Sequence, residues 1–321
     1  MEVKPLDRNE VTVEAPATTG NVAVGYDILG GAVTGRADRV TVRRLDVRDV
    51  RVEGIAGCVT DLPTKPEDNT ATAALQHLQA SRGLDFGFSV MIEKGIPLGS
   101  GLGGSAASAV GAVVAAANLL PDPLSCDDLF PHALAGEAVA SGDIHPDNVA
   151  PCLYGGLVLT REVDPPDVIS IPVPSRIRCV LVRPEYMVET REARACLPET
   201  VSLSDAVRQC SHLGAFVAGC YRDDVELIGR ALRDIIVEPH RASLVPGFRD
   251  VQEAALEAGA LGCSLSGAGP TTFAWCASEE TATSVRERMT EAFARHDLPT
   301  EAWISPISEE GARVVRPRRG G

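Results

Sequence analysis

The stretch GIPLGSGLGGSAAS, residues 95–108, constrains this chain more than any other part of its sequence. Four glycines fall within residues 99–104, and an alanine-rich run without charged residues continues to Leu120. Glycines let a backbone turn sharply and approach a ligand closely, and the first N–H groups of a helix attract anions because they lack partners inside it. We therefore predict a phosphate-binding loop at the start of a helix. The alternative is a helix start in which small residues serve only tight packing.

Three well-known nucleotide-binding motifs that contain glycine do not explain this part of the chain. A Walker A motif needs Lys where this chain has Ser105. The loop matches the spacing of a dinucleotide fingerprint, but Pro97 separates it from the preceding strand, and the position about 20 residues further on falls in the break PDP at 121–123. The DFG at 85–87 lacks the other protein-kinase motifs. The loop is of a nucleotide-binding type outside these three classes.

The charge balance and the absence of export signals narrow the range of partners. The net charge is −14 at pH 7, so a nucleic-acid backbone would be repelled. The first ten residues, MEVKPLDRNE, contain no apolar signal core, and the longest apolar run, 106–120, is too short to span a bilayer. Nine scattered cysteines without a C-x-x-C pair indicate reduced thiols. We expect a cytoplasmic protein that binds a small molecule and neither nucleic acid nor membrane.

The hydrophobic periodicity predicts a mixed α+β chain with two domains. Runs typical of strands lie at 11–15, 39–52, 86–93 and 178–182. Patterns typical of helices lie at 69–83, 106–120, 126–140, 202–220, 223–235, 248–259 and 279–296. PATTGN after the first strand indicates a turn-rich loop, LYGGLVLT at 153–160 a hairpin, and CSLSGAGPTTFAWC at 263–276 two strands around a glycine turn. DPPD at 164–167 and PVPSR at 172–176 are linker-like, which predicts a domain boundary near 165–175.

The glycine-rich loop resembles the phosphate loop of the GHMP kinases, the superfamily of galactokinase, homoserine kinase, mevalonate kinase and phosphomevalonate kinase. APATTGNVAVGYDILGGAV at 15–33 resembles the first motif of that superfamily, and LSGAGPTTFAW at 265–275 resembles the third. The resemblance covers nearly the whole chain. It implies the two-domain GHMP kinase fold, with a ribosomal protein S5 domain 2-like ATP-binding domain over residues 1–168 and a ferredoxin-like α+β domain over residues 169–321.

Within the superfamily, the chain is most similar to the homoserine kinases. The first motif lacks the Lys or Arg of the mevalonate and galactokinase types, and the galactokinase pattern G-E-H-x-D-Y is absent. GEAVASGDIHPDNVAP at 136–151, ETREARACLP at 189–198 and EPHRASLVPGF at 238–248 resemble segments peculiar to homoserine kinases, although Tyr26 and Gly104 replace their usual Phe and Ser. The resemblance implies ATP-dependent phosphorylation of L-homoserine to O-phospho-L-homoserine in threonine biosynthesis, by a homodimer.

The resemblance also assigns roles to individual residues. Arg194 and Arg241 would hold the homoserine carboxylate, since Arg forms bidentate, charge-assisted hydrogen bonds, and Asp27 would accept the ammonium group. The same pocket would include Asn21, His145 and Thr190. ATP would lie against Asn69, near the adenine, and against the loop residues Pro97, Leu98, Gly99, Ser100, Gly101, Leu102, Gly103, Gly104, Ser105, Ala106 and Ala107.

Magnesium and the reacting hydroxyl complete the site that the resemblance implies. Mg²⁺ bridging the β- and γ-phosphates would be bound by Ser105 and Glu137, and a salt bridge from Glu137 to an Arg is the alternative. Mevalonate-type relatives use an Asp as the base, but the corresponding position here is Asn148. Because the transition state is loose, positioning suffices. We expect Asn148 to orient the hydroxyl and Thr190 to be a second catalytic residue, and Asp147 stays open as a base.

Two rival functions follow from the same motifs. One is another small-molecule GHMP kinase that acts on a sugar or an isoprenoid alcohol. The other is a non-catalytic nucleotide- or metabolite-binding regulator with the same fold. The arginine pair with Asp27 favours an amino acid as substrate, and the presence of both Ser105 and Glu137 argues against a regulator.

Overall fold

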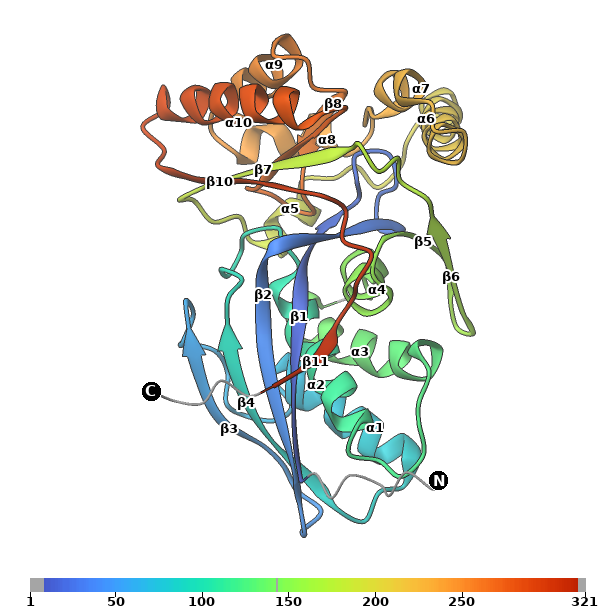
Figure 1. The fold of residues 1–321 in the computed structure, drawn as a ribbon, viewed down its shortest axis with the longest axis vertical. Coiled ribbons are helices and arrows are strands. Elements are labelled where there is room, and N and C mark those ends of the chain that lie inside the picture. The colour runs from blue at the N-terminus through green and yellow to red at the C-terminus, as the bar shows by residue number, and fades with distance from the viewer. Residues whose placement is uncertain (1–8, 143, 317–321) are drawn as a thin grey trace.

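A computed structural model describes residues 9–142 and 144–316 and divides them between two sheets (Figure 1). The larger sheet forms the lower part of the molecule, and the helices between residues 70 and 154 lie against one of its faces. The smaller sheet forms the upper part; α9 and α10 lie above it, α6 and α7 lie beside it, and α5 lies below it. The phosphate loop belongs to the larger unit, at the end that faces the smaller one.

The larger sheet has the strand order β11-β1-β2-β4-β3, and a hairpin of β5 and β6 is attached to the start of β2. All neighbours are antiparallel except β3 and β4, which are parallel. A bulge between Pro16 and Ala17 shifts the register of the long β1–β2 pair. The strands are β1 (Glu10–Gly20), β2 (Leu29–Leu45), β3 (Val50–Gly57), β4 (Gly87–Lys94), β5 (Leu157–Val163), β6 (Pro166–Ile171) and β11 (Arg313–Val315).

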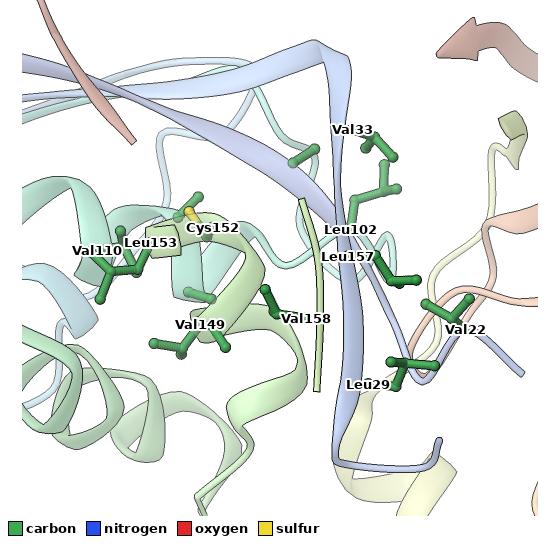
Figure 2. Close-up of a cluster of buried hydrophobic side chains, with 14 of the residues drawn as sticks. Val22, Leu29, Val33, Leu102, Val110, Val149, Cys152, Leu153, Leu157 and Val158 are labelled. Atoms are coloured by element: carbon green, nitrogen blue, oxygen red, sulfur yellow. The ribbon is translucent and has the colours of Figure 1, made fainter. Parts of the chain in front are cut away.

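The helices of the larger unit pack closely because their facing residues are small. These helices are α1 (Thr70–Arg82), α2 (Gly104–Ala117), α3 (Cys126–Ser141) and α4 (Pro146–Tyr154). Asn69 caps the start of α1, and Gly83, with φ 61°, ends it. Most of α2 is buried alanine and valine. Figure 2 shows the resulting core, in which Leu102 of the phosphate loop lies among side chains of α2, α4, β2 and β5.

The smaller unit has an antiparallel sheet in the order β10-β7-β9-β8. Its strands are β7 (Arg178–Pro184), β8 (Gly262–Leu265), β9 (Thr272–Cys276) and β10 (Thr300–Ser305). Its helices are α5 (Thr190–Ala195), α6 (Leu203–Tyr221), α7 (Val225–Ala231), α8 (Glu238–Arg241), the 3-10 turn η1 (Ala242–Leu244), α9 (Phe248–Glu257) and α10 (Glu279–Ala294). A second core of buried apolar side chains joins α9 and α10 to this sheet.

The mixed α+β class is confirmed, but three local predictions are wrong. PATTGN is not a loop up to Gly20, because β1 resumes its pairing with β2 after the bulge. LYGGLVLT is not a hairpin, because its first two residues end α4 and two left-handed glycines, Gly155 and Gly156, turn the chain into β5. DPPD is the turn of the β5–β6 hairpin and not a linker. The domain boundary at 168/169 stays a prediction.

Candidate active site

The phosphate loop joins the end of β4 to the start of α2, and three of its glycines have a left-handed backbone. The φ angle is 59° at Gly99, 75° at Gly101 and 67° at Gly103, a region that other residues rarely adopt. At Gly101 there is also a steric reason, because a Cβ there would collide with the carbonyl oxygen of Ser266. The fourth glycine of the motif, Gly104, is already the first residue of α2.

The other two motifs hold this loop in place. From the third motif, the Oγ of Ser266 donates a hydrogen bond of 2.6 Å to the carbonyl oxygen of Gly101. From the first motif, the N–H of Thr18 in β1 donates to the carbonyl oxygen of Leu102 at 3.1 Å. The Leu102 side chain is buried in the core (Figure 2). The three motifs therefore form one site, with the loop at its centre.

The start of α2 presents backbone donors to the space above the loop. Gly103 precedes the helix and has no side chain that could cap it. The first hydrogen bond within α2 runs from the N–H of Ala107 to the carbonyl oxygen of Gly103 at 2.9 Å. The N–H groups of residues 104–106 come before this bond and are of the kind that binds phosphate oxygens at a helix start.

A buried carboxylate, Asp38 of β2, lies beneath the loop. Its side chain is 0% exposed. Its Oδ1 accepts hydrogen bonds from the N–H groups of Gly95 and Ile96, at 3.0 and 3.1 Å. Its Oδ2 pairs with the Lys94 ammonium group and accepts a hydrogen bond from the Ser108 Oγ at 3.0 Å. Asp38 thus joins the beginning of the loop to the second turn of α2.

Lys94 completes this buried network from the other side. Its Nζ donates to the carbonyl oxygen of Gly104 at 2.6 Å and to the Ser108 Oγ at 3.0 Å. We call Asp38, Lys94 and Ser108 the loop anchor, because together they hold both ends of the phosphate loop. The loop anchor was not predicted from the sequence. A signal was present, since Lys94 is one of only three lysines in the chain and stands directly before the loop.

The two residues expected to bind magnesium face each other across α2 and α3. The Ser105 Oγ donates a hydrogen bond of 3.0 Å to the Glu137 Oε1, and Glu137 is 7% exposed. Burial raises the pKa of Glu137 to about 7, and the charge on Asp147 raises it as well, whereas the Ser105 hydrogen bond and Lys94 lower it. Within the described residues, no group of three or more His, Cys, Asp or Glu could hold a metal. A carboxylate and a hydroxyl suit Mg²⁺, which keeps several waters.

Two arginines from the smaller unit meet the first motif at the expected amino-acid pocket. Arg194 of α5 donates to the Asp27 carboxylate at 2.7 Å and to the Tyr26 hydroxyl at 2.8 Å. Arg241 of α8 is 3% exposed and donates to the carbonyl oxygen of Gly267 at 3.0 Å. The two guanidinium groups lie 5.5 and 5.2 Å from the centre of the Tyr26 ring. The structure therefore brings both arginines together with Asp27.

The turn that carries Asn21 and Asp27 has an unusual backbone. Three consecutive non-glycine residues, Asn21, Val22 and Ala23, have φ angles of 67°, 41° and 59°, and Asp27 has 61°. Such conformations cost on the order of 1–2 kcal/mol each. The Asn21 side chain stabilises the turn, because its Oδ1 accepts from the N–H of Asp27 at 3.0 Å and its Nδ2 donates to the carbonyl oxygen of Gly267 at 3.1 Å. The strained turn thus connects Asn21 to Gly267 of the third motif and presents Asp27 to Arg194.

The start of α4 carries three further residues of the expected site. His145 precedes the helix and is 6% exposed, and Asp147 is 4% exposed. The Asn148 Oδ1 accepts a hydrogen bond from the Thr18 Oγ1 at 2.8 Å. A Cβ at Gly20 would collide with the Asp147 carboxylate and would lie 2.8 Å from the Asn148 Nδ2. Gly20 therefore allows both side chains to approach the end of β1.

The charge state of Asp147 depends on its surroundings. Burial raises its pKa to about 7, and the charge on Asp27 raises it further, whereas Arg194, Arg241 and a backbone hydrogen bond at Asn21 lower it. The influence of Asp27 and both arginines shows that Asp147 belongs to the same electrostatic cluster as the amino-acid pocket. Near neutral pH, this carboxyl group is therefore close to its titration midpoint.

Two of the expected residues are not joined to this cluster. Thr190 is the first residue of α5 and is exposed, and no hydrogen bond links it to Asn148 within residues 9–142 and 144–316. Asn69 is 3% exposed and uses its side chain to cap α1, accepting from the N–H groups of Ala71 and Thr72 and donating to the carbonyl oxygen of Pro63 at 2.8 Å. Their roles at the hydroxyl and the adenine stay predictions.

Comparisons with known proteins agree with this geometry. The GHMP kinases N terminal domain matches residues 69–156, and the GHMP kinases C terminal domain matches residues 213–295. A homoserine kinase of Xanthomonas campestris is 47% identical over 307 residues, which cover 95% of this chain and 94% of that protein. A homoserine kinase of Chlorobium phaeobacteroides is 44% identical over 95% of this chain and 99% of its own length.

The fold agrees equally well with a solved structure. A crystal structure of a homoserine kinase from Cytophaga hutchinsonii superimposes with a TM-score of 0.94 at 42% identity, and covers 98% of this chain and 100% of that one. A mevalonate kinase from L. major superimposes with a TM-score of 0.67 at 15% identity, which extends the likeness of fold to the wider superfamily. In the part of the chain that the structure describes, no helix combines the length and the apolar character needed to cross a membrane.

Proposed function

This chain belongs to the homoserine kinase family of the GHMP kinases, and we propose that it transfers the γ-phosphate of ATP to the side-chain hydroxyl of L-homoserine, giving O-phospho-L-homoserine for threonine biosynthesis. One observation carries the proposal for the substrate. Arg194 pairs with Asp27, the guanidinium groups of Arg194 and Arg241 both lie near Tyr26, and the charges of all three act on the buried Asp147. By resemblance, we also propose that the enzyme is a cytoplasmic homodimer.

The pocket suits an amino acid because it contains both signs of charge. Free homoserine carries a carboxylate and an ammonium group. The guanidinium groups of Arg194 and Arg241 would bind the carboxylate, and the Asp27 carboxylate, now paired with Arg194, would accept the ammonium. Galactose and mevalonate have no ammonium group for Asp27 to bind. This difference favours homoserine over the substrates of the other GHMP kinases.

The phosphate loop would hold the triphosphate through its backbone. The N–H groups of residues 104–106 and the dipole of α2 are oriented toward a bound anion. The loop anchor and Ser266 fix the loop before the nucleotide binds, so little ordering is required on binding. The Ser105 hydroxyl and the buried Glu137 carboxylate would bind Mg²⁺, which when present neutralises charge on the β- and γ-phosphates.

Asn148 would orient the substrate hydroxyl without removing its proton. Its Oδ1 is already held by Thr18, which leaves the Nδ2 group to face the pocket beside Gly20. An amide cannot act as a base at neutral pH, and a loose transition state needs little proton transfer before the bond to phosphorus breaks. Asp147 is the other candidate for proton transfer, since its pKa of about 7 lies near the operating pH.

Release of ADP with three different acceptors tests this function. We expect turnover with L-homoserine and none above background with mevalonate or galactose, and ³¹P NMR should identify the product as a phosphate monoester of homoserine. The variant Asp27→Asn tests the binding of the ammonium group, because it keeps the shape of the side chain but removes its charge. We expect this variant to turn over homoserine less well than the wild type does. No turnover of homoserine, or equal turnover by the Asp27→Asn variant, would contradict the proposal.

A further inference from the structure

The hydroxyl group of Tyr26 lies beside both arginines of the amino-acid pocket. The Arg194 Nη1 donates a hydrogen bond of 2.8 Å to it, and the Arg241 Nη2 lies 3.5 Å from it, at the limit of a hydrogen bond. We call Arg194 and Arg241 the arginine pair. The homoserine kinase motif usually has Phe at position 26, so this hydroxyl is a polar group that the proposed function does not use.

The turn around Tyr26 fixes the position of its side chain. On one side, the N–H of Asp27 donates to the Asn21 Oδ1 at 3.0 Å. On the other side, the carbonyl oxygen of Gly25 accepts a hydrogen bond of 2.9 Å from the N–H of Leu29. The Tyr26 side chain itself is half-buried. Because the backbone is held on both sides, the hydroxyl has a defined place relative to the arginine pair.

The proton of the Tyr26 hydroxyl has no acceptor within residues 9–142 and 144–316. A phenol oxygen accepts hydrogen bonds and also donates one, and the arginine pair uses only its acceptor side. Burial raises the pKa of Tyr26, and the charges on Asp27 and Asp147 raise it as well, whereas Arg194 and Arg241 lower it. The hydroxyl therefore keeps its proton at neutral pH and can donate it to a ligand.

The arginine pair is not fully neutralised by the residues that the structure describes. Arg241 is 3% exposed and donates to the carbonyl oxygens of Ala193 and Gly267, at 2.9 and 3.0 Å, but none of these residues forms a salt bridge with it. Arg194 pairs with Asp27, but its buried Nε has no hydrogen-bond partner among the same residues. A buried cation without a counter-charge is costly. The groups around the Tyr26 hydroxyl therefore suit an anionic part of a ligand.

We propose that the Tyr26 hydroxyl binds the carboxylate of the substrate together with the arginine pair, by donating its proton to one of the carboxylate oxygens. This inference rests on the proposed function, because it assumes that an amino acid occupies the pocket. A carboxylate has about four acceptor positions on its two oxygens, enough for two guanidinium groups and one hydroxyl. A hydrogen bond to a charged oxygen is also stronger than one between neutral groups. Tyr26 is thus a specificity-determining residue for the carboxylate end of the substrate.

The same hydroxyl would hold Arg194 in place while the substrate binds. Asp27 is paired with Arg194, and the ammonium group of the substrate would compete for this carboxylate. The hydrogen bond from Arg194 to the Tyr26 hydroxyl does not involve Asp27 and would remain. Two neighbouring residues of one turn would therefore serve the two ends of the amino acid, Tyr26 the carboxylate and Asp27 the ammonium.

The substitution Tyr26→Phe tests the inference because it removes only the hydroxyl oxygen. We expect the KM for L-homoserine to rise about 10-fold or more, while kcat at saturating homoserine and the KM for ATP stay unchanged. Calorimetric titration with L-homoserine should show the same loss of affinity without turnover. Tyr221→Phe is the matched control and should behave as the wild type, because the exposed Tyr221 hydroxyl donates to the carbonyl oxygen of Ser170 at 3.2 Å. Circular dichroism checks the folding of both variants.

The acceptor 3-amino-1-propanol separates a role at the carboxylate from a general structural role. This molecule has the hydroxyl and ammonium groups of homoserine but no carboxylate. Its kcat/KM should be the same for Tyr26→Phe and wild type, whereas kcat/KM for homoserine should fall about 10-fold or more.

Three results would contradict these expectations in different ways. An equal loss with both acceptors, or an unchanged affinity of Tyr26→Phe for homoserine, would overturn the inference and leave the proposed function intact. A wild type that binds homoserine without releasing ADP would refute the proposed function, and the calorimetric comparison would still decide the role of Tyr26. A wild type that does not bind homoserine would overturn both.

Discussion

Asp147 provides a test of both the electrostatics and the chemistry of the site. We predict that the stability of the Asp147→Asn variant, measured relative to the wild type, increases as the pH rises. We also predict that its kcat stays close to that of the wild type. The carboxyl group is 4% exposed, and its pKa is raised from 3.8 to about 7, mainly by burial. Asparagine has nearly the same shape but binds no proton in this range. The substitution therefore removes the titration with little change in packing.

The magnitude follows from the difference between the folded and unfolded chain. Between pH 3.8 and about 7, folded Asp147 keeps a proton that the unfolded chain releases. Its contribution to stability is therefore complete below about pH 4 and is lost as the pH rises through 7. At about 1.4 kcal/mol per pKa unit, the full contribution is on the order of 4 kcal/mol, and more than half of it disappears between pH 5 and pH 8.

Urea unfolding at pH 5, 6, 7 and 8, without nucleotide, measures this effect. The free energy of unfolding of Asp147→Asn, relative to the wild type, should increase by roughly 2–3 kcal/mol over that range. Asp122→Asn, a substitution at an exposed carboxylate, should show no such trend. A constant difference between Asp147→Asn and wild type would refute the raised pKa. A fall in kcat of about 100-fold or more would instead make Asp147 the base.

Three further predictions concern the clamp, the metal site and the loop anchor. Arg194→Ala should raise the KM for homoserine by an amount equivalent to about 2–5 kcal/mol, and an unchanged KM in steady-state assays would remove Arg194 from the clamp. Glu137→Ala should lower kcat and weaken the dependence on Mg²⁺ concentration, whereas a normal Mg²⁺ titration would argue against a ligand role. Lys94→Met should cost about 3–5 kcal/mol of stability, because it leaves Asp38 charged and unpaired in the core. Adding Asp38→Asn should recover part of that loss in urea unfolding, and a purely additive double variant would contradict the pairing.

Much of the fold follows from local patterns that can be read in the chain. The helix at 70–82 has a polar cap at Asn69 and a left-handed glycine at its end, and α2 follows its glycine loop as predicted. Local patterns failed where pairing with a distant strand determined the conformation. PATTG resembles a loop, but its residues extend β1 because β2 supplies hydrogen-bond partners beyond the bulge. The short helix α4 was not predicted, because it has only nine residues and contains Pro151 in its interior.

The sequence by itself was sufficient to predict a glycine turn followed directly by a helix at residues 99–104. Glycines at 99, 101 and 103, followed by an uncapped alanine-rich helix, predict a tight left-handed turn and unpaired N–H groups at the helix start, because both features depend on residues that are neighbours in the chain. The motifs around the loop were also sufficient to identify the family. Both conclusions depend on residues that are neighbours in the chain.

Only the tertiary structure decided which charged groups meet and how burial alters them. Arg194 and Asp27 are 167 positions apart, and Asn21 reaches a carbonyl oxygen 246 positions away. Asp38 and Lys94 looked like ordinary strand residues until the fold buried them together beneath the loop. The physical reason is that ion pairing and pKa values depend on distance and on exclusion of water. The distance between two charged groups and the water around them are fixed only when the whole chain has folded.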